Sequence, residues 1–135
     1  GYSLEIWRKA LNPKILVGIE NHPEMIDFEL IEKLGVHIVT FNSKAAFDKV
    51  KSITGNIDFL FIDGDHSYEG VKSDFELYSP LVRYGGIIAL HDIMIKDPVY
   101  HGIVEVNKFW NEVKKNYQCR ELTSLDGTGT GVIFV

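Results

Sequence analysis

The stretch from Ile57 to Ile93 reads IDFLFIDGDHSYEGVKSDFELYSPLVRYGGIIALHDI. It contains two apolar runs of strand length, Phe59–Ile62 and Ile87–Leu90, and each run ends in acidic and imidazole side chains. The segment between them, Tyr68–Arg83, carries apolar residues at helical spacing, and Gly85-Gly86 predicts a turn into the second strand. Because a strand, a helix and a second strand in this order form a βαβ unit with parallel strands, we predict such a unit at the centre of the fold.

Polar side chains follow both strands of this unit. Asp63, Asp65 and His66 come after the first strand, and His91 and Asp92 close the second. The carboxyl ends of neighbouring parallel strands lie on one edge of a sheet, which is where open α/β sheets bind ligands. We therefore expect Asp63 and Asp92 to lie close enough to share one ion, directly or through water. Asp65 is typical of a turn or cap residue rather than a ligand.

The bulk composition limits the class of protein. The chain has 135 residues, of which 45% are hydrophobic, and this suits a single domain over residues 1–135 with a core of its own. A net charge of −5 argues against nucleic acid as a partner, and no apolar run approaches the length of a membrane span. The single Cys119 cannot form an internal disulfide, so we expect a cytoplasmic protein, with a homo-oligomer left open.

The remaining elements follow from the same periodicities. We predict helices over Leu4–Leu11, Pro23–Leu34, Ser43–Ile53 and His101–Tyr117, and strands over Lys14–Glu20, Val36–Phe41, Gln118–Thr123 and Gly131–Val135. The last two strands read as an antiparallel pair around a Gly/Thr loop. Alternating strands and helices indicate an α/β fold with a doubly wound, mostly parallel sheet and an antiparallel pair at the C-terminus.

The first residues indicate a strand-to-helix turn. Gly1-Tyr2-Ser3 stands directly before the first helix, and Ser3 is a plausible N-cap. This arrangement is typical of the end of a glycine-rich loop, so we expect the first strand of the domain and its first glycines to lie before Gly1. The alternative is a smaller domain that begins with a helix.

At these residues the chain resembles a known family. Glu20 at a strand end, the block Ile62–Tyr68, the pair Gly85-Gly86 and the closing His91-Asp92 resemble class I S-adenosylmethionine-dependent methyltransferases, which have a Rossmann-like fold. The branch that is most similar contains the metal-dependent O-methyltransferases, including macrocin O-methyltransferase and cephalosporin-hydroxylase-like proteins. The resemblance implies methyl transfer to a hydroxyl of a small molecule or sugar, assisted by a divalent metal.

The resemblance also implies a cofactor site for S-adenosylmethionine. Glu20 would accept hydrogen bonds from the ribose hydroxyls, which is the role of an acid at this strand end. The other residues that the resemblance assigns to the cofactor are Gly1, Tyr2 and Ser3 near its amino-acid part, Asn42 and Ser43 beside its adenine, and Asp63.

Metal and base roles are implied for the polar strand ends. Asp63, His91 and Asp92 would hold a divalent ion, with Mg²⁺ or Mn²⁺ expected, while His66, with Asp63, would serve catalysis as a general base. The sugar-methylating relatives carry an acid where this chain has His91. Imidazole suits Zn, Mn or Fe better than Mg. Three alternatives therefore stay open: the metal is softer than Mg, His91 is not a ligand, or the metal site is weak.

Other interpretations of the same residues exist. Asp63 and Asp92 could cap the structures that follow them, and His66 could be a helix-start residue bonded to backbone. A metal-dependent hydrolase could use the same Asp/His cluster, and a non-catalytic domain could keep the fold without the activity. Binding of S-adenosylhomocysteine separates a methyltransferase from a hydrolase.

Overall fold

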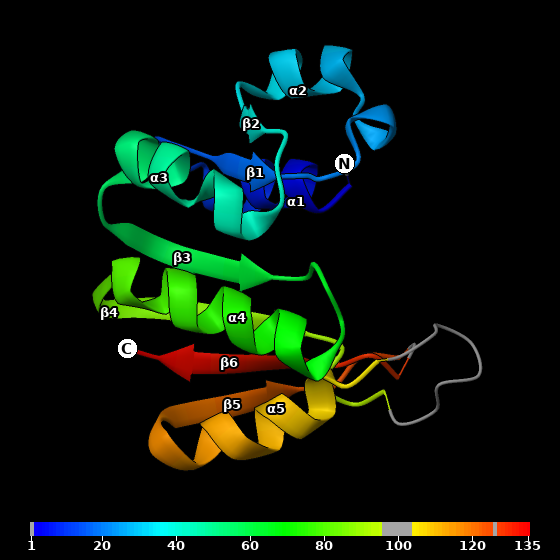
Figure 1. The fold of residues 1–135 in the computed structure, drawn as a ribbon, viewed down its shortest axis with the longest axis vertical. Helices are drawn as coiled ribbons and strands as arrows, with labels where there is room; N and C mark the ends of the chain where they lie inside the picture. The colour runs from blue at the N-terminus through cyan, green and yellow to red at the C-terminus, as the bar shows by residue number, and fades with distance from the viewer. Residues whose placement is uncertain (1, 96–103, 126) are drawn as a thin grey trace. The chain divides into compact units, whose positions relative to one another are not determined.

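The computed structural model of the chain describes residues 2–95, 104–125 and 127–135. The chain divides into two compact units, Gly1–Gly55 (unit 1) and Asn56–Val135 (unit 2). Figure 1 shows the helices and strands of both units. Every helix within the described residues is too short or too polar to cross a lipid bilayer.

Unit 1 pairs two short parallel strands with helices. Its elements in chain order are α1 (Tyr2–Leu11), β1 (Val17–Ile19), the 3-10 helix η1 (Pro23–Met25), α2 (Phe28–Leu34), β2 (His37–Val39) and α3 (Ser43–Thr54). β1 and β2 are in register from Val17 opposite His37 to Ile19 opposite Val39. The two strands therefore end at the same edge of their small sheet.

Two expectations for unit 1 are wrong in detail. The predicted helix Pro23–Leu34 is two helices, because Ile26 is extended and the carboxylate of Asp27 caps α2 by accepting a bond from the Leu30 amide at 3.0 Å. An aspartate that caps a helix begins it, so Asp27 overrides the periodicity before it. Ser3 is not an N-cap, because α1 already includes Tyr2.

Unit 2 is built on a four-stranded mixed sheet. Its elements are β3 (Ile57–Ile62), α4 (Tyr68–Tyr78), η2 (Ser79–Leu81), β4 (Val82–His91), α5 (Val106–Val113), η3 (Lys114–Asn116), β5 (Gln118–Leu122) and β6 (Thr130–Phe134). The strand order is β3-β4-β6-β5, with β3 and β4 parallel and the pairs β4–β6 and β5–β6 antiparallel. The predicted βαβ unit and the antiparallel C-terminal pair are both confirmed.

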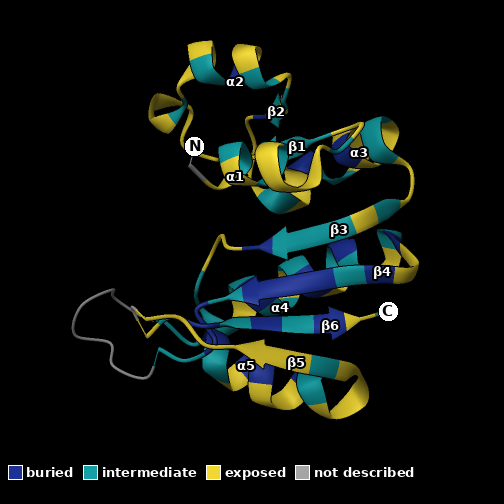
Figure 2. Cartoon of the chain, turned by 180° about the vertical axis from the view of Figure 1, so that it is seen from behind, coloured by how far each residue is buried: buried dark blue, intermediate teal, exposed yellow. Residues whose placement is uncertain are grey.

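The core of unit 2 lies between this sheet and two helices. α4 and α5 contact each other, and the residues that they bury against β4 and β6 include Val71, Phe75, Phe109 and Trp110. Figure 2 shows β4 as the most continuously buried strand, from Gly86 to Leu90 with Ile87 half-buried. Because β4 is buried and pairs with a strand on either side, the backbone at its end, which carries His91 and Asp92, is held in place.

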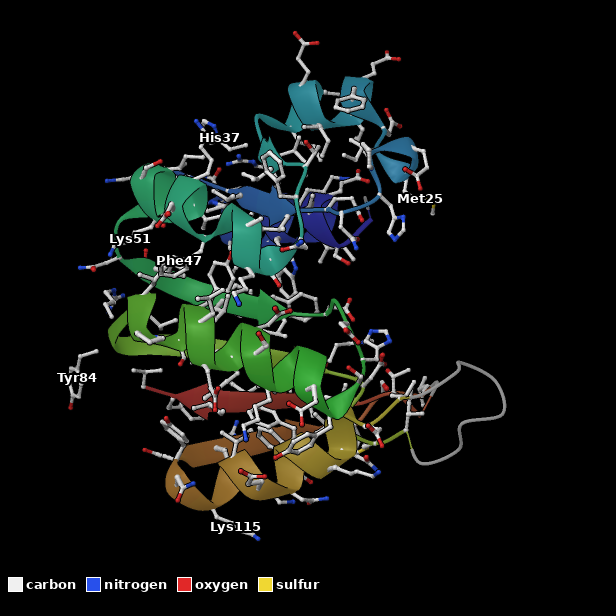
Figure 3. All side chains as sticks on the ribbon, viewed as in Figure 1. Met25, His37, Phe47, Lys51, Tyr84 and Lys115 are labelled. Carbon is white, nitrogen blue, oxygen red and sulfur yellow. The ribbon has the colours of Figure 1, made fainter. Side chains whose placement is uncertain are left out.

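The glycine pair lies inside a strand rather than before one. β4 begins at Val82, so the predicted helix Tyr68–Arg83 ends early and Gly85-Gly86 belongs to the strand. The pairing with β3 shifts register between Ile57 and Phe59, Gly85 has a φ of +77°, and a Cβ on Gly86 would lie 2.6 Å from the Val82 side chain. These are the features of a β-bulge, where glycine relieves the crowding. Tyr84 beside it is 93% exposed and projects away from the ribbon (Figure 3).

The late helix is shorter than predicted. α5 covers Val106–Val113 and continues as η3, whereas the predicted start around His101 lies outside the described residues. The predicted apolar face is confirmed within α5, since Val106, Phe109, Trp110 and Val113 are all buried.

Candidate metal and catalytic site

The strand ends of the βαβ unit meet as the sequence predicts. Ile62, the last residue of β3, lies opposite Leu90 near the end of β4. The residues that follow these parallel strands therefore leave the sheet at one edge, and Asp63 and Asp92 come together there. The expectation that the two carboxylates share an edge is confirmed.

Three side chains form a cluster with the dimensions of an ion site. Asp63, His66 and Asp92 each offer one ligand atom, and these atoms all lie within 4.8 Å of one another. His66 Nε2 is 3.4 Å from Asp63 Oδ1 and 3.4 Å from Asp92 Oδ2. Two carboxylates and one imidazole are ligands that Mn²⁺, Fe²⁺ and Zn²⁺ accept, and the carboxylates also suit Mg²⁺.

The nitrogen at the centre of this cluster lacks a hydrogen bond. His66 Nε2 is buried, although the side chain as a whole is 35% exposed, and it makes no hydrogen bond of acceptable geometry with any described residue. A buried polar atom without a partner is costly, and such atoms in native proteins usually have a reason. The residues fit a cation, because a cation between these three groups would satisfy the nitrogen and both carboxylates together.

His91 contacts the same carboxylates but stands outside this set of three. Its Nδ1 is 2.9 Å from Asp92 Oδ1 and 3.4 Å from Asp63 Oδ1, and its ring lies against Phe61 with the ring centroids 6.0 Å apart. The structure thus groups His66, rather than His91, with the two aspartates as potential ligands. His91 is placed to hold the Asp92 carboxylate in its orientation.

The backbone of Asp92 is unusual for a residue with a side chain. Its φ is +61°, in the left-handed region, and the residue is only 6% exposed. Aspartate tolerates this conformation better than most residues, yet it still costs free energy relative to an extended strand. The chain turns sharply after β4 at this point, and the Met94 amide then bonds to the Thr128 carbonyl at 2.9 Å. A buried, strained carboxylate at a strand end is typical of a functional position.

The loop that carries His66 is shaped by its own polar side chains. Asp65 Oδ1 accepts a bond from the Ser67 amide at 2.9 Å, and Ser67 Oγ caps α4 by accepting from the Gly70 amide at 3.1 Å. The bond from the Ser67 amide holds the pKa of the exposed Asp65 carboxyl below its usual value. Asp65 is therefore a turn residue, as its sequence context predicts.

One residue near the site carries no signal in the sequence. The Glu105 amide donates to the His66 carbonyl at 2.8 Å, and Glu105 Oε2 accepts from the Tyr68 amide at 3.3 Å. Because Glu105 is 37 positions from Tyr68 and is one of many acidic residues in the chain, neither spacing nor composition marks it. Only the packing of α5 against α4 reveals the contact.

The residues expected near the cofactor lie in unit 1, except for Asp63, which lies in unit 2 within the cluster of Asp63, His66 and Asp92. Glu20 follows β1, and its Oε1 accepts from the His22 amide at 3.0 Å. Asn42 follows β2 and caps α3, with Oδ1 accepting from the Ala45 amide at 2.9 Å, and Ser43 is the first residue of that helix. Both segments leave parallel strands at one edge of their sheet. The ribose and adenine roles stay predictions.

The first three residues are described only in part. Gly1 is outside the described residues, and only the backbone of Tyr2 is described. Ser3 is exposed within the first turn of α1. Their predicted role beside the amino-acid part of the cofactor stays a prediction.

Comparison with known proteins decides the family. The profile of a family described as a methyltransferase domain matches residues 1–93, which is more than half of the chain. The chain belongs to this methyltransferase domain family. The βαβ unit and the ion cluster both lie within or at the end of the matched region, so the family and the site concern the same residues.

A viral protein is similar in sequence to this methyltransferase domain. Uncharacterized protein R132 of Acanthamoeba polyphaga mimivirus is 42% identical over 86 residues. The match covers 62% of the methyltransferase domain and 39% of the viral protein. The chain thus corresponds to well under half the length of this relative.

Solved structures share the fold at low identity. A Staphylococcus aureus protein described as a candidate caffeoyl-CoA O-methyltransferase superposes with a TM-score of 0.75 at 21% identity, covering 98% of this chain and 69% of its own. MycE methyltransferase of the mycinamycin biosynthetic pathway, solved with Mg and S-adenosylhomocysteine, gives a TM-score of 0.66 at 16% identity, with 98% of this chain and 39% of its own covered. The methyltransferase domain therefore has the α/β Rossmann-like methyltransferase fold, with antiparallel C-terminal strands in a mixed sheet. The resemblance to class I methyltransferases is confirmed in family and fold, and the similar O-methyltransferases show the fold alone.

Proposed function

We propose that this methyltransferase domain transfers a methyl group from S-adenosylmethionine to a hydroxyl of a small molecule or sugar, and that Asp63, His66 and Asp92 hold a divalent cation. The observation that carries the proposal is the buried His66 Nε2 at 3.4 Å from both carboxylates, without a hydrogen bond to any described residue. O-methyltransferases among the proteins of the same fold, one of them solved with Mg, support the reaction class.

The ligand set favours a particular ion. Mg²⁺ takes oxygen ligands and keeps several waters, whereas an imidazole beside two carboxylates suits Mn²⁺ better. We therefore propose Mn²⁺ as the tighter-binding ion and Mg²⁺ as a weaker substitute. When bound, such an ion supplies a Lewis acid that lowers the pKa of a substrate hydroxyl.

The residues of the domain itself supply orientation. Asp92 is 6% exposed, and His91 Nδ1 at 2.9 Å holds its carboxylate, so its oxygens are presented in a fixed direction. Methyl transfer is an in-line displacement, and its rate depends on holding nucleophile and methyl group in alignment. In unit 1, we assign the ribose hydroxyls to Glu20 and the adenine to Asn42 and Ser43.

His66 can have one of two roles, metal ligand or general base, and an experiment can distinguish them. As a ligand through Nε2, which the geometry favours, its replacement should remove ion binding and activity together. As the general base predicted from the sequence, its replacement should leave ion affinity intact and slow methyl transfer by roughly 10²–10⁴-fold. Calorimetry of His66→Ala with Mn²⁺ separates these outcomes without a substrate.

The test of the proposed function uses calorimetry with two ligands. The wild-type chain should bind S-adenosylhomocysteine and, separately, Mn²⁺, and a chelator should remove the second heat only. A metal-dependent hydrolase would bind Mn²⁺ without S-adenosylhomocysteine. Binding of neither ligand would favour a non-catalytic domain and contradict the proposal.

A further inference from the structure

We propose that Glu105, the residue at the start of α5, positions His66 for its role at the cation site. The inference rests on the proposed function, since it concerns the same site. It assigns to α5 a task that the family match, which ends at residue 93, does not include. Glu105 acts on the backbone of the loop that carries His66.

The contact has two hydrogen bonds that run in opposite directions. The Glu105 amide donates to the His66 carbonyl at 2.8 Å, and the Glu105 carboxylate accepts from the Tyr68 amide at 3.3 Å. The two bonds reach the residues at either side of Ser67, so they fix both the position and the direction of this part of the loop. A single bond would leave the loop free to rotate about it.

His66 needs such support more than its two neighbours do. Asp63 directly follows β3 and Asp92 directly follows β4, so the sheet itself places both carboxylates. His66 lies farther along, in the loop before α4. The bonds from Asp65 and Ser67 are local and shape this loop internally, whereas Glu105 comes from another helix and ties the loop to the body of unit 2.

The side chain of Glu105 is used for this loop and not for its own helix. Glu105 is the N-cap residue of α5, yet its side chain makes no capping bond to α5. Its carboxylate is paired with the Tyr68 amide and the Lys108 ammonium, which together lower the pKa of the carboxyl, Lys108 having the larger effect. Glutamate is also not among the preferred N-cap residues, which are Ser, Thr, Asp and Asn. The residue therefore fits the loop of His66 better than it fits the start of α5.

Because Glu105 bonds to the loop of His66 and does not cap α5, replacing it by a better N-cap residue tests the proposal. In Glu105→Asp the shorter side chain suits an N-cap and should bond to α5, but it should no longer reach the Tyr68 amide. The variant should fold at least as stably as wild type while the side-chain bond to the Tyr68 amide is lost, and the backbone bond to the His66 carbonyl stays as the single remaining bond of the two. Glu105→Gln keeps an acceptor oxygen at full length and should rescue the wild-type behaviour.

The control lies on the same two helices. Glu112 Oε2 accepts a bond from the Tyr68 hydroxyl at 2.6 Å, so Glu112→Gln alters an α4–α5 contact at the Tyr68 side chain and leaves the bond from the Tyr68 amide to Glu105 in place. Three measurements apply to all variants of the whole chain: hydrogen exchange of the Tyr68 amide, the NMR signals of the His66 ring at fixed pH, and Mn²⁺ affinity by calorimetry.

For Glu105→Asp and Glu105→Ala we expect faster exchange of the Tyr68 amide, broadened or shifted His66 ring signals, and Mn²⁺ binding weakened about tenfold, as when partners of metal ligands are removed. Glu105→Gln and Glu112→Gln should match wild type. Unchanged His66 ring signals in Glu105→Asp would overturn the proposal, as would equal effects from Glu112→Gln. If the wild-type chain binds no Mn²⁺, the cation part of the proposed function fails, and the ring signals alone decide the role of Glu105.

Discussion

Each unit has a pair of parallel strands with polar residues at their carboxyl ends. The two units differ in the groups to which these polar residues bond. In unit 1, Glu20 and Asn42 accept bonds from the amides of His22 and Ala45, which lie two and three residues ahead. In unit 2, Asp63, His66 and Asp92 contact one another across the sheet edge, and His66 Nε2 has no hydrogen bond among the described residues.

The difference shows what kind of ligand each edge can take. In unit 1, Glu20 and Asn42 each accept a bond from a nearby amide, and these bonds shape the loops after β1 and β2. The cluster in unit 2 holds two carboxylates and a nitrogen without a hydrogen bond in the described part of the chain, and a cation between them would satisfy all three. Our proposal therefore places the cation in unit 2 and the ribose and adenine contacts in unit 1.

The largest expected effect tests the cluster in unit 2. Asp92→Asn keeps a residue that tolerates a φ of +61° but removes the charge. Mn²⁺ affinity in calorimetry should fall by more than about 100-fold, since partners that only orient a metal ligand already contribute 10- to 100-fold. Asp65→Asn makes the same charge change in an exposed turn and should have little effect. Equal affinities for Asp92→Asn and wild type would remove the cation from this cluster.

The next effect tests the loops of unit 1. Glu20→Ala should weaken binding of S-adenosylhomocysteine by about 1–3 kcal/mol, the usual loss for a charged hydrogen-bond partner. Glu24→Ala removes an exposed carboxylate that bonds to His22 in the same segment and should leave the affinity as it is. Isothermal calorimetry measures both. An unchanged affinity in Glu20→Ala would show that the edge of unit 1 does not hold the ribose.

A third measurement contrasts a buried and an exposed tyrosine of unit 2 at alkaline pH. Burial, with a smaller effect of Asp74, raises the pKa of Tyr78 in α4 of unit 2 from 10.0 to about 12. A raised pKa means that the folded state keeps a proton which the unfolded state loses, so stability present below pH 10 should be lost as the pH rises towards 12.

Between pH 9 and pH 12, the free energy of unfolding of the wild type should fall by on the order of 2 kcal/mol more than that of Tyr78→Phe, because phenylalanine has no proton to lose. Urea titration at each pH measures this free energy. Tyr84→Phe, at the 93% exposed tyrosine of Figure 3, is the control and should retain the wild-type slope. Identical slopes for wild type and Tyr78→Phe would contradict the assignment.

The smallest expected effect concerns a local bond of unit 1. Asn42→Ala removes the cap of α3 and should lower the free energy of unfolding by about 0.5–2 kcal/mol, whereas Asn42→Asp should keep the cap. Thermal unfolding of both variants gives the comparison. A loss of S-adenosylhomocysteine binding in Asn42→Asp beyond its effect on stability would assign the side chain directly to the cofactor.

The sequence predicts the frame of the site because that frame depends on short-range patterns. Apolar runs of strand length, a helical period between them and acids at their ends are sufficient to bring Asp63 and Asp92 to one edge. The choice between His66 and His91 depends on distances between side chains that come from different loops and strands. The periodicity of the sequence contains no information about such distances.

Element boundaries are harder for a related reason. Asp27 and the pair Gly85-Gly86 both interrupt a pattern, and whether an interruption ends an element or is accommodated within it depends on the neighbouring chain. The bulge in β4 exists because β3 pairs on both sides of it. Glu105 is the extreme case, since its partners become visible only after α5 has packed against α4.

The strand order of unit 2 has a consequence for biosynthesis. β6 lies between β4 and β5, although it is the last of the three to leave the ribosome. Until it is made, β5 has no strand beside it within this sheet and the β6-facing side of β4 offers unpaired amides and carbonyls, which is a template for pairing with other chains. The nascent chain should therefore need protection by chaperones up to residue 134, and truncation before Thr130 should yield aggregation rather than a smaller folded domain.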